Sequence, residues 1–246
     1  IFHDDQHGAA IVATAALRNA LKIVGKKMEN LKVATVGIGA AGGATIRMLL
    51  AAGVRNIVAV DRNGILNKND PKTLLNEFHR EIVEEINPDN LSGDLAKAVK
   101  GADVFIGTSV GGIISAEMIK SMAPGAIVFA LANPVPEIMP DLAKEAGAKI
   151  VATGRSDFPN QINNVLAFPG IFRGALDVRS REINESMKLA ATDALADAVG
   201  DDRLSVDYIL PKAFEPGIAR RVALAVAKAS LESGSAKLKI SPDDVE

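Results

Sequence analysis

The sequence contains no cysteine and no tryptophan, and its only tyrosine is Tyr208. The lack of cysteine excludes disulfide bonds, thiolate catalysis and cysteine-ligated zinc, and it fits a cytoplasmic location. The formal net charge of −2 provides no positive excess for binding nucleic acid or an anionic membrane. Arg18, Asn19 and Lys22 interrupt the most apolar early stretch, which is therefore expected to be a buried helix rather than a membrane span. We expect a cytoplasmic chain without nucleic-acid or membrane partners.

Short apolar runs alternate with helical patterns through the first 154 residues. Strands are predicted at 31–39, 56–61, 103–109, 126–134 and 148–154. Helices are predicted at 8–24, 40–52, 72–86, 94–102, 115–122 and 137–146, then at 171–178, 182–199 and 216–232. This alternation predicts an α/β fold of the Rossmann type, a doubly wound parallel sheet with additional C-terminal helices packed around it. Residues 168–170 are expected to form a packing turn, and residues 241–246 a frayed tail.

A glycine-rich loop follows the first predicted strand. Gly37, Gly39 and Gly42 have the G-x-G-x-x-G spacing, directly after a strand and at the start of a helix. The first glycine permits a tight turn, the second lets a pyrophosphate approach the backbone, and the third allows close packing of helix on strand. Ile38, Ala40 and Ala41 complete the loop, and the amides of Ala40 and Ala41 would face an anion at the helix N-terminus. The loop predicts dinucleotide binding, the alternative being a strand–helix turn without a ligand.

An acidic residue stands where such sites bind the ribose. Asp61 ends the second predicted strand, 19 residues after Gly42. Its carboxylate would repel a 2′-phosphate and so favours NAD, whereas the adjacent Arg62 could contact that phosphate and so allows NADP. His79 lies in a charged helix and is expected to be solvated.

Polar side chains collect where the later strands end, which is where open parallel sheets bind ligands. Thr108 and Ser109 are candidates for contacting the cofactor, Asn133 for contacting cofactor or substrate, and Asn163 and Asn164 for contacting substrate. An asparagine amide can donate and accept without carrying charge, so it suits a carboxylate or a nicotinamide amide. The alternative for each asparagine is a turn that satisfies its own backbone. Asp157, in the same region, is expected to be a structural loop residue or a helix cap.

The chain opens with two carboxylates between two histidines. Asp4 and Asp5 are flanked by His3 and His7, just before the first predicted helix. Carboxylates suit Mg²⁺ or Mn²⁺, which prefer oxygen ligands. Taken alone, an aspartate before a helix is more commonly a cap and dipole partner, and histidines here are more commonly solvated than zinc ligands.

Several longer segments resemble the C-terminal, dinucleotide-binding half of malic enzymes, especially the small prokaryotic type. The segments are FHDDQHGAAIV (2–12), VGIGAAG (36–42), VDRNGIL (60–66), FALANPVPEI (129–138), ATGRSDFPNQINNVLAFPGIFRGALD (152–177) and YILPKAFEP (208–216). The resemblance implies oxidation of L-malate with NAD or NADP and decarboxylation to pyruvate and CO2, with a divalent ion bound to the substrate.

The resemblance also assigns roles to individual residues. It implies that Asp5 is a metal ligand, that Asp4 lies behind it near the catalytic lysine, and that Asn133 and Asn163 contact nicotinamide and substrate, with Asn164 beside them. In the family, a tyrosine acid, a lysine base and an adjacent Glu-Asp metal pair precede the FHDDQHG motif, with which this chain begins. Tyr208 does not match that tyrosine. We therefore expect a chain that binds dinucleotide, lacks full activity alone, and needs an N-terminal catalytic domain in an enzyme that is a homo-oligomer.

The resulting division of the chain has three parts. Residues 1–25 form a leading helix with the metal-ligand motif, residues 31–154 the Rossmann core, and residues 155–246 the substrate-side loop and C-terminal helices. Two other functions stay open from the residues: an amino-acid or shikimate-type dehydrogenase with a similar Rossmann half, and a non-enzymatic nucleotide-binding module.

Overall fold

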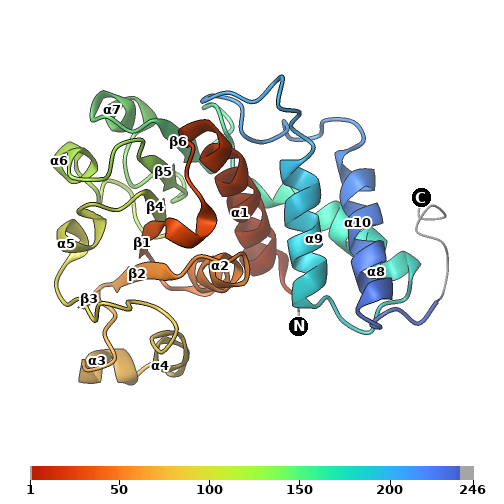
Figure 1. Cartoon of the computed structure of the whole chain (residues 1–246), viewed down its shortest axis with the longest axis horizontal. Helices are drawn as coiled ribbons and strands as arrows, with labels where there is room; N and C mark the ends of the chain where they lie inside the picture. Colours follow the sequence, from red (N-terminus) through yellow and green to blue (C-terminus); the bar gives the residue numbers. More distant parts are fainter. Residues whose placement is uncertain (1, 239–246) are drawn as a thin grey trace.

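A six-stranded sheet forms the centre of the fold in the computed structural model, which describes residues 2–238 (Figure 1). The strands are β1 (Lys32–Val36), β2 (Asn56–Asp61), β3 (Gly64–Ile65), β4 (Val104–Gly107), β5 (Ile127–Ala130) and β6 (Ile150–Thr153). Their order is β3-β2-β1-β4-β5-β6, and all neighbours pair in parallel except β3, which runs antiparallel to β2. This confirms the predicted α/β fold with a mostly parallel sheet. The order reverses between β1 and β4, where such sheets bind ligands.

Helices cover both faces of the sheet. They are α1 (Asp4–Val24), α2 (Ala40–Ala51), α3 (Pro71–Leu74), α4 (Glu77–Ile82), α5 (Leu95–Val99), α6 (Ala116–Lys120), α7 (Pro140–Glu145), α8 (Phe168–Asp177), α9 (Glu185–Ala196) and α10 (Ile218–Glu232), with 3₁₀ turns η1 (Met28–Asn30) and η2 (Asn164–Leu166). Alternate strand residues face two apolar layers: Val33 of β1 packs in the layer with α1 and α2, and Ala34 in the layer with α5. The strands are therefore buried on both faces, as short apolar runs predict.

The prediction of one continuous helix over residues 72–86 is wrong. Two short helices, α3 and α4, replace it, because two side chains cap separate N-termini. Asp70 accepts a hydrogen bond from the amide of Lys72, and Asn76 accepts one from the amide of His79. The Asn76 cap satisfies the amide of His79, which a continuous helix would pair internally, so the chain restarts its helix at Glu77.

The expected packing turn at residues 168–170 is also wrong, because these residues form the first turn of α8. Proline suits that position, since its missing N–H would have no helical partner there. A side chain at Gly170 would collide with the carbonyl oxygen of Ala219 in α10, and one at Gly174 with that of Ala223. The glycines therefore let α8 and α10 approach closely.

The C-terminal helices do not wrap the sheet as expected. Figure 1 shows α8, α9 and α10 grouped beyond α1, which lies between them and the strands. Asn19 of α1 is fully buried and its amide donates to the carbonyl oxygens of Ala196 (2.9 Å) and Ile209 (3.0 Å). The helix that carries Asp4 and Asp5 is thus held between the sheet and the C-terminal group. The predicted tail at 241–246 lies outside the described residues.

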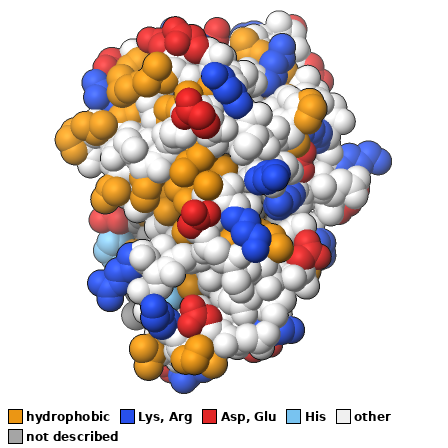
Figure 2. All heavy atoms as spheres, turned by 90° about the vertical axis from the view of Figure 1, so that its left-hand side faces the viewer, with side chains coloured by type: hydrophobic (Ala, Val, Ile, Leu, Met, Phe, Trp, Pro, Cys, Tyr) orange, Lys and Arg blue, Asp and Glu red, His pale blue; other side chains and the backbone are white. Residues whose placement is uncertain are grey.

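The surface carries charges of both signs. On the face in Figure 2, basic and acidic side chains are interspersed, and hydrophobic side chains form several separate groups. Within residues 2–238, no helix combines the length and hydropathy needed to cross a membrane.

Candidate functional site

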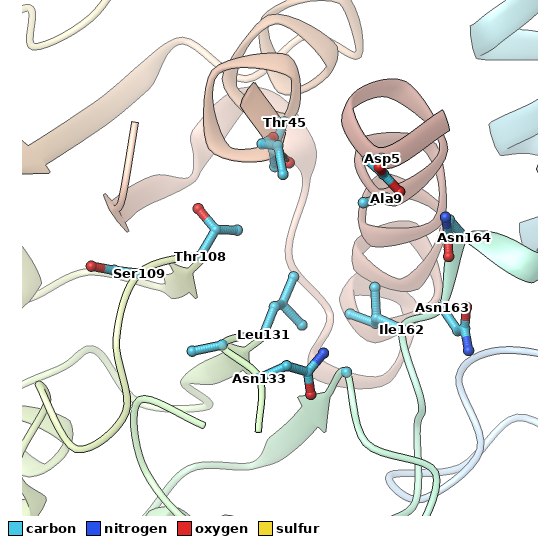
Figure 3. A pocket seen from close by; sticks show the side chains of 13 residues that line it. Asp5, Ala9, Thr45, Thr108, Ser109, Leu131, Asn133, Ile162, Asn163 and Asn164 are labelled. Carbon is cyan, nitrogen blue, oxygen red and sulfur yellow. Dashed lines mark hydrogen bonds between the residues drawn. The ribbon is translucent and has the colours of Figure 1, made fainter. Parts of the chain in front are cut away.

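A cavity of about 380 Å³ opens at the carboxyl ends of the strands. Its walls are Asp5, Ala9, Ala41, Thr45, Thr108, Ser109, Leu131, Ala132, Asn133, Gly154, Ile162, Asn163 and Asn164. Figure 3 shows Asp5 on α1, Thr45 on α2, Thr108 after β4 and Asn133 after β5 arranged around one opening. The structure therefore brings together the candidate residues from the chain start, the helix after the glycine loop and two strand ends.

The glycine loop has the geometry that the motif predicts. Gly37 adopts a left-handed φ of 87°, which favours glycine. A Cβ at Gly42 would collide with the carbonyl oxygen of Gly37, so helix α2 can lie this close to β1 only because residue 42 is glycine. A Cβ at Gly39, in contrast, would meet no atom within 4 Å. The surface at Gly39 is therefore open to a ligand at the N-terminus of α2.

The glycine loop also borders a second hollow of about 350 Å³. Ile38, Gly39 and Ala40 line it together with Arg47 and Phe78. The Arg47 guanidinium lies 5.2 Å from the centre of the Phe78 ring and pairs with Glu81 at 2.9 Å. The positive charge near Gly39 is thus already shared with an aromatic face and a carboxylate.

Asp61 and Arg62 line a separate groove beyond the glycine loop, between the end of β2 and residues 92–97. One Asp61 oxygen accepts a hydrogen bond from the amide of Asn63 at 2.7 Å, and the other lies 3.8 Å from Nδ1 of His79. Each carboxylate oxygen has two lone pairs, so capacity for a ribose hydroxyl remains. The prediction that His79 is solvated is wrong: only 8% of its surface is exposed, because α4 packs it beneath Asp61.

The three asparagines have different surroundings. Asn133 is exposed at the cavity edge, and its amide nitrogen would lie 3.0 Å from a Cβ placed on Gly154. Asn163 caps η2 by accepting from the amide of Val165 at 3.1 Å. Asn164 donates to an oxygen of Asp4. Asn133 is therefore free to meet a ligand, whereas Asn163 and Asn164 also support the local structure.

Asp4 and Asp5 lie in the first turn of α1 rather than before it, so neither is the N-cap, although both stand at the helix end that favours negative charge. Asp5 is exposed and lines the cavity. Asp4 points to η2, with one oxygen bonded to Asn164 and the other buried without a partner. Burial raises the pKa of the Asp4 carboxyl above its usual range, the bond from Asn164 opposing this effect.

Of the two flanking histidines, His3 is exposed as expected, but His7 is not fully solvated. His7 is half-buried, and its Nδ1 accepts a hydrogen bond from the backbone amide of His3 at 2.9 Å. Burial lowers the pKa of the His7 imidazole. Phe2 stacks on the same ring, with the ring centres 5.1 Å apart. His7 therefore closes the start of α1, where amides have no helical partner.

A divalent ion fits the donor chemistry of Asp5 but not a full coordination shell. Within residues 2–238, no three or more histidines or acidic side chains form a group able to hold an ion. Asp5 presents a hard oxygen ligand, the type that Mg²⁺ and Mn²⁺ prefer, to a cavity otherwise lined by uncharged polar and apolar residues. It can serve as one ligand of such an ion.

Sequence reasoning missed two polar residues at or behind the cavity wall. Thr45 lines the cavity from the second turn of α2, and no motif singles it out. Glu137 is fully buried behind the cavity wall and accepts hydrogen bonds from the amides of Ser109 and Ala132. A lone acid between Pro136 and Ile138 was the available signal. Asp157 pairs with Arg155 through two hydrogen bonds of 2.6 and 2.8 Å, which confirms it as a structural loop residue.

The family model and the most similar known proteins both point to malic enzymes. The family model described as "Malic enzyme, NAD binding domain" matches residues 6–231. The chain is 53% identical over 245 residues to the bifunctional malic/malolactic enzyme of Bacillus subtilis, covering 100% of this chain and 60% of that protein. It is 55% identical over 237 residues to the NAD-dependent malic enzyme of Geobacillus stearothermophilus, covering 96% and 49%. Other relatives are named NADP-dependent malic enzymes.

A solved structure agrees with the sequence matches. The malic enzyme from Pyrococcus horikoshii superimposes with a TM-score of 0.95 at 45% identity, covering 100% of this chain and 58% of that one. The chain thus spans about half to three fifths of the length of these relatives. Because the glycine loop, the strand order and these matches agree, the chain belongs to the malic enzyme family and corresponds to the NAD-binding domain of its members.

Proposed function

We propose that this chain is the dinucleotide-binding part of an enzyme that converts L-malate to pyruvate and CO2 by oxidative decarboxylation. The enzyme would use NAD or NADP as the oxidant and Mg²⁺ or Mn²⁺ as the metal ion. The observation that carries the proposal is the cavity in which Asp5, Thr108 and Asn133 meet beside the glycine loop. The groove at Asp61 lies on the other side of that loop. An extended dinucleotide can therefore cross Gly39 with its nicotinamide in the cavity and its adenosine in the groove.

Each part of the chain has a binding or orienting role in this proposal. The amides at the start of α2 bind the pyrophosphate, and Asp61 accepts from a ribose hydroxyl. Thr108, Ser109 and Asn133 orient the nicotinamide, while Asn163 and Asn164 border the malate. Asp5 supplies one metal ligand, and Asp4, held by Asn164, lies behind it near the catalytic lysine. An ion held there would supply Lewis-acid polarisation of the substrate oxygen and would offset the negative charge that develops as CO2 leaves.

The remaining chemistry belongs to a preceding domain. We place the tyrosine acid, the lysine base and the other two carboxylate ligands there, and we assign homo-oligomerisation to the assembled enzyme. The chain offers no group for these roles at the cavity, since its side chains there are Asp5 and neutral residues. Residues 1–25, 31–154 and 155–246 would act as the metal-ligand helix, the dinucleotide core and the substrate-side cover.

Titration of the chain with NADH and with NADPH tests the cofactor part. The absence of tryptophan leaves nicotinamide fluorescence free of an indole background. We expect saturable binding of both, with NADH tighter, because Asp61 would repel the 2′-phosphate. Asp61→Ser should reverse the order, and Arg62→Ala should weaken NADPH alone. A folded chain that binds neither would contradict the proposal.

A chimera tests the full activity. The part of the Bacillus subtilis relative that precedes its match to this chain would be joined to residue 1. We expect malate-dependent reduction of NAD, and we expect Asp5→Asn to weaken Mn²⁺ binding as measured by electron paramagnetic resonance. A folded chimera that binds NADH but never oxidises malate would contradict the malic enzyme assignment for this chain.

A further inference from the structure

Glu137 is a buried carboxylate that joins the ends of two neighbouring strands. None of its surface is exposed. Oε1 accepts from the amide of Ser109 at 2.8 Å, and Oε2 accepts from the amide of Ala132 at 3.0 Å. Ser109 follows β4 and Ala132 follows β5, so each oxygen of one side chain holds a different segment.

These two hydrogen bonds lie just beyond the point where the pairing of β4 with β5 ends. The ladder between β4 and β5 ends with the amide of Leu131 donating to the carbonyl oxygen of Gly107 at 3.0 Å. Beyond that bond the chains separate, and the next amides would lack strand partners. Ala132 is buried, and a buried amide without a partner costs about 1–3 kcal/mol, so its amide in particular needs an acceptor in this gap. The carboxylate of Glu137 continues the connection past the last ladder bond.

The surrounding sequence makes room for this carboxylate. A Cβ at Gly107 would collide with the carboxyl group of Glu137, so the last residue of β4 must be glycine for the side chain to fit. The backbone around Glu137 also holds the following loop: its carbonyl oxygen accepts from the amide of Ile114 at 3.2 Å, and that of Pro136 accepts from Gly112 at 3.1 Å. The carboxylate thus belongs to a group of four hydrogen bonds, three of which join residues 109–114 to residues 136–137 and one of which joins Ala132 to Glu137.

Both segments form one end of the cavity. Ser109 and Ala132 line it directly, and each is adjacent to a predicted ligand-binding side chain, Thr108 and Asn133 respectively. A change in the distance between the two segments would move these side chains relative to each other. It would leave Asp61 untouched, because that residue lies in a separate groove.

We propose that Glu137 is a positioning residue that sets the spacing of the Thr108–Ser109 and Ala132–Asn133 segments, and so controls binding of the nicotinamide half of the dinucleotide. The inference rests on the proposed function, in which this cavity binds the nicotinamide. Glu137 touches neither cofactor nor substrate, and it acts through the two backbone amides.

Glu137→Gln tests the inference with little change of shape. Its side-chain NH2 would face one of the two backbone donors, so one segment would lose its acceptor. We expect the dissociation constant for NADH to rise about tenfold, a change of about 1.4 kcal/mol. Binding of ADP-ribose, which lacks the nicotinamide, should stay within about twofold. Glu145→Gln, on the exposed end of α7, is the matched control and should alter neither constant.

Gly107→Ala tests the same connection from the other side, because its Cβ would displace the Glu137 carboxyl. It should reproduce the selective loss of NADH binding. Amide hydrogen exchange of the wild-type chain needs no variant: the amide of Ser109 should exchange slowly although Ser109 is exposed. Rapid exchange there would overturn the inference whether or not the variants fold.

The remaining outcomes separate the inference from the proposed function. If the wild-type chain binds NADH but Glu137→Gln leaves its affinity unchanged, or weakens NADH and ADP-ribose equally, the positioning role is wrong and the proposed function stands. If the folded wild-type chain does not bind NADH, both fail.

Discussion

The hydroxyl of Thr108 donates a hydrogen bond of 2.8 Å to the carbonyl oxygen of Gly37. The bond connects the segment after β4 with the glycine loop after β1, across the point where the strand order reverses. The amide of Thr108 also donates to Val36 at 2.9 Å. The two walls of the proposed dinucleotide crevice are therefore fixed to each other before any ligand binds.

Two glycines of the loop should respond differently to the same substitution. Gly42→Ala places a methyl group against the backbone of Gly37 and should destabilise the fold by about 1–3 kcal/mol, because that backbone cannot retreat. Gly39→Ala meets no protein atom and should cost less than about 1 kcal/mol, yet its methyl group should block the pyrophosphate. Urea unfolding and NADH titration of both variants measure the two effects.

The contrast between Gly39 and Gly42 is itself the control. Equal losses of stability in the two variants would contradict the packing role given to Gly42. Unchanged NADH affinity in a stable Gly39→Ala variant would mean that the pyrophosphate does not cross this residue.

The asparagines should also separate binding from stability. Asn133→Ala should weaken NADH or substrate binding with little change in melting temperature, since the side chain is exposed at the cavity. Asn164→Ala removes the donor to Asp4, whose other oxygen is already buried without a partner, and should cost about 1–3 kcal/mol. Thermal unfolding with and without NADH distinguishes them; a destabilised Asn133→Ala variant would point to a structural role instead.

Asn19 is expected to be a major link between α1 and the C-terminal region. Asn19→Ala leaves the carbonyl oxygens of Ala196 and Ile209 without their side-chain donor in a fully buried place. We expect a loss of about 2–4 kcal/mol in urea unfolding. Lys22→Ala, which removes an exposed ion pair to Asp201, should cost less than about 1 kcal/mol. Similar costs for both would contradict this role of Asn19.

Asp193 should make stability depend on pH in the acid range. Burial raises the pKa of its carboxyl above the ordinary 3.8, Arg18 opposes this and Asp197 adds to it. The folded chain therefore keeps a proton that the unfolded chain has released, and this stabilisation, complete below pH 3.8, is lost as pH rises through the folded pKa.

Urea unfolding from about pH 3.5 to about pH 6.5 measures this effect. The free energy of unfolding of the wild type, relative to that of Asp193→Asn, should fall across the window. Asp89→Asn, at an exposed position, is the control and should follow the wild type. An opposite slope would show that the attraction of Arg18 outweighs burial.

The apolar runs predicted the sheet because a strand buried on both faces needs apolar side chains on each. Val33 and Ala34 of β1, for example, pack into the apolar layers on opposite faces. The glycine loop was predictable because its φ and close contacts admit few residues. The break between α3 and α4 was not, since Asn76 acts as a cap only when the chain turns there. β3 was not predicted, because a strand of two residues is too short to show an alternation of apolar and polar residues.

Site residues that belong to a local sequence motif could be predicted, whereas residues whose role depends on contacts with distant segments could not. Asp5 and Asn133 were identified from the sequence, with the family resemblance deciding the role of Asp5, and the structure brings both to one cavity. The burial of His79 under Asp61 depends on how α4 packs, which its charged neighbours in the sequence do not indicate. Glu137 needed the structure, because its partners lie on two separate segments.

The place of α1 has a consequence for how the polypeptide is made. A ribosome adds about 5–20 residues per second, so Ala196 follows Asn19 by roughly 10–35 s. During that interval α2 is available to pack against α1, but α9, which covers another side of α1 in the finished fold, has not yet been made. The helix that presents Asp5 is thus made before the sheet but covered only after α9 is made, and a nascent chain halted before α9 would leave one apolar side of α1 exposed to chaperones.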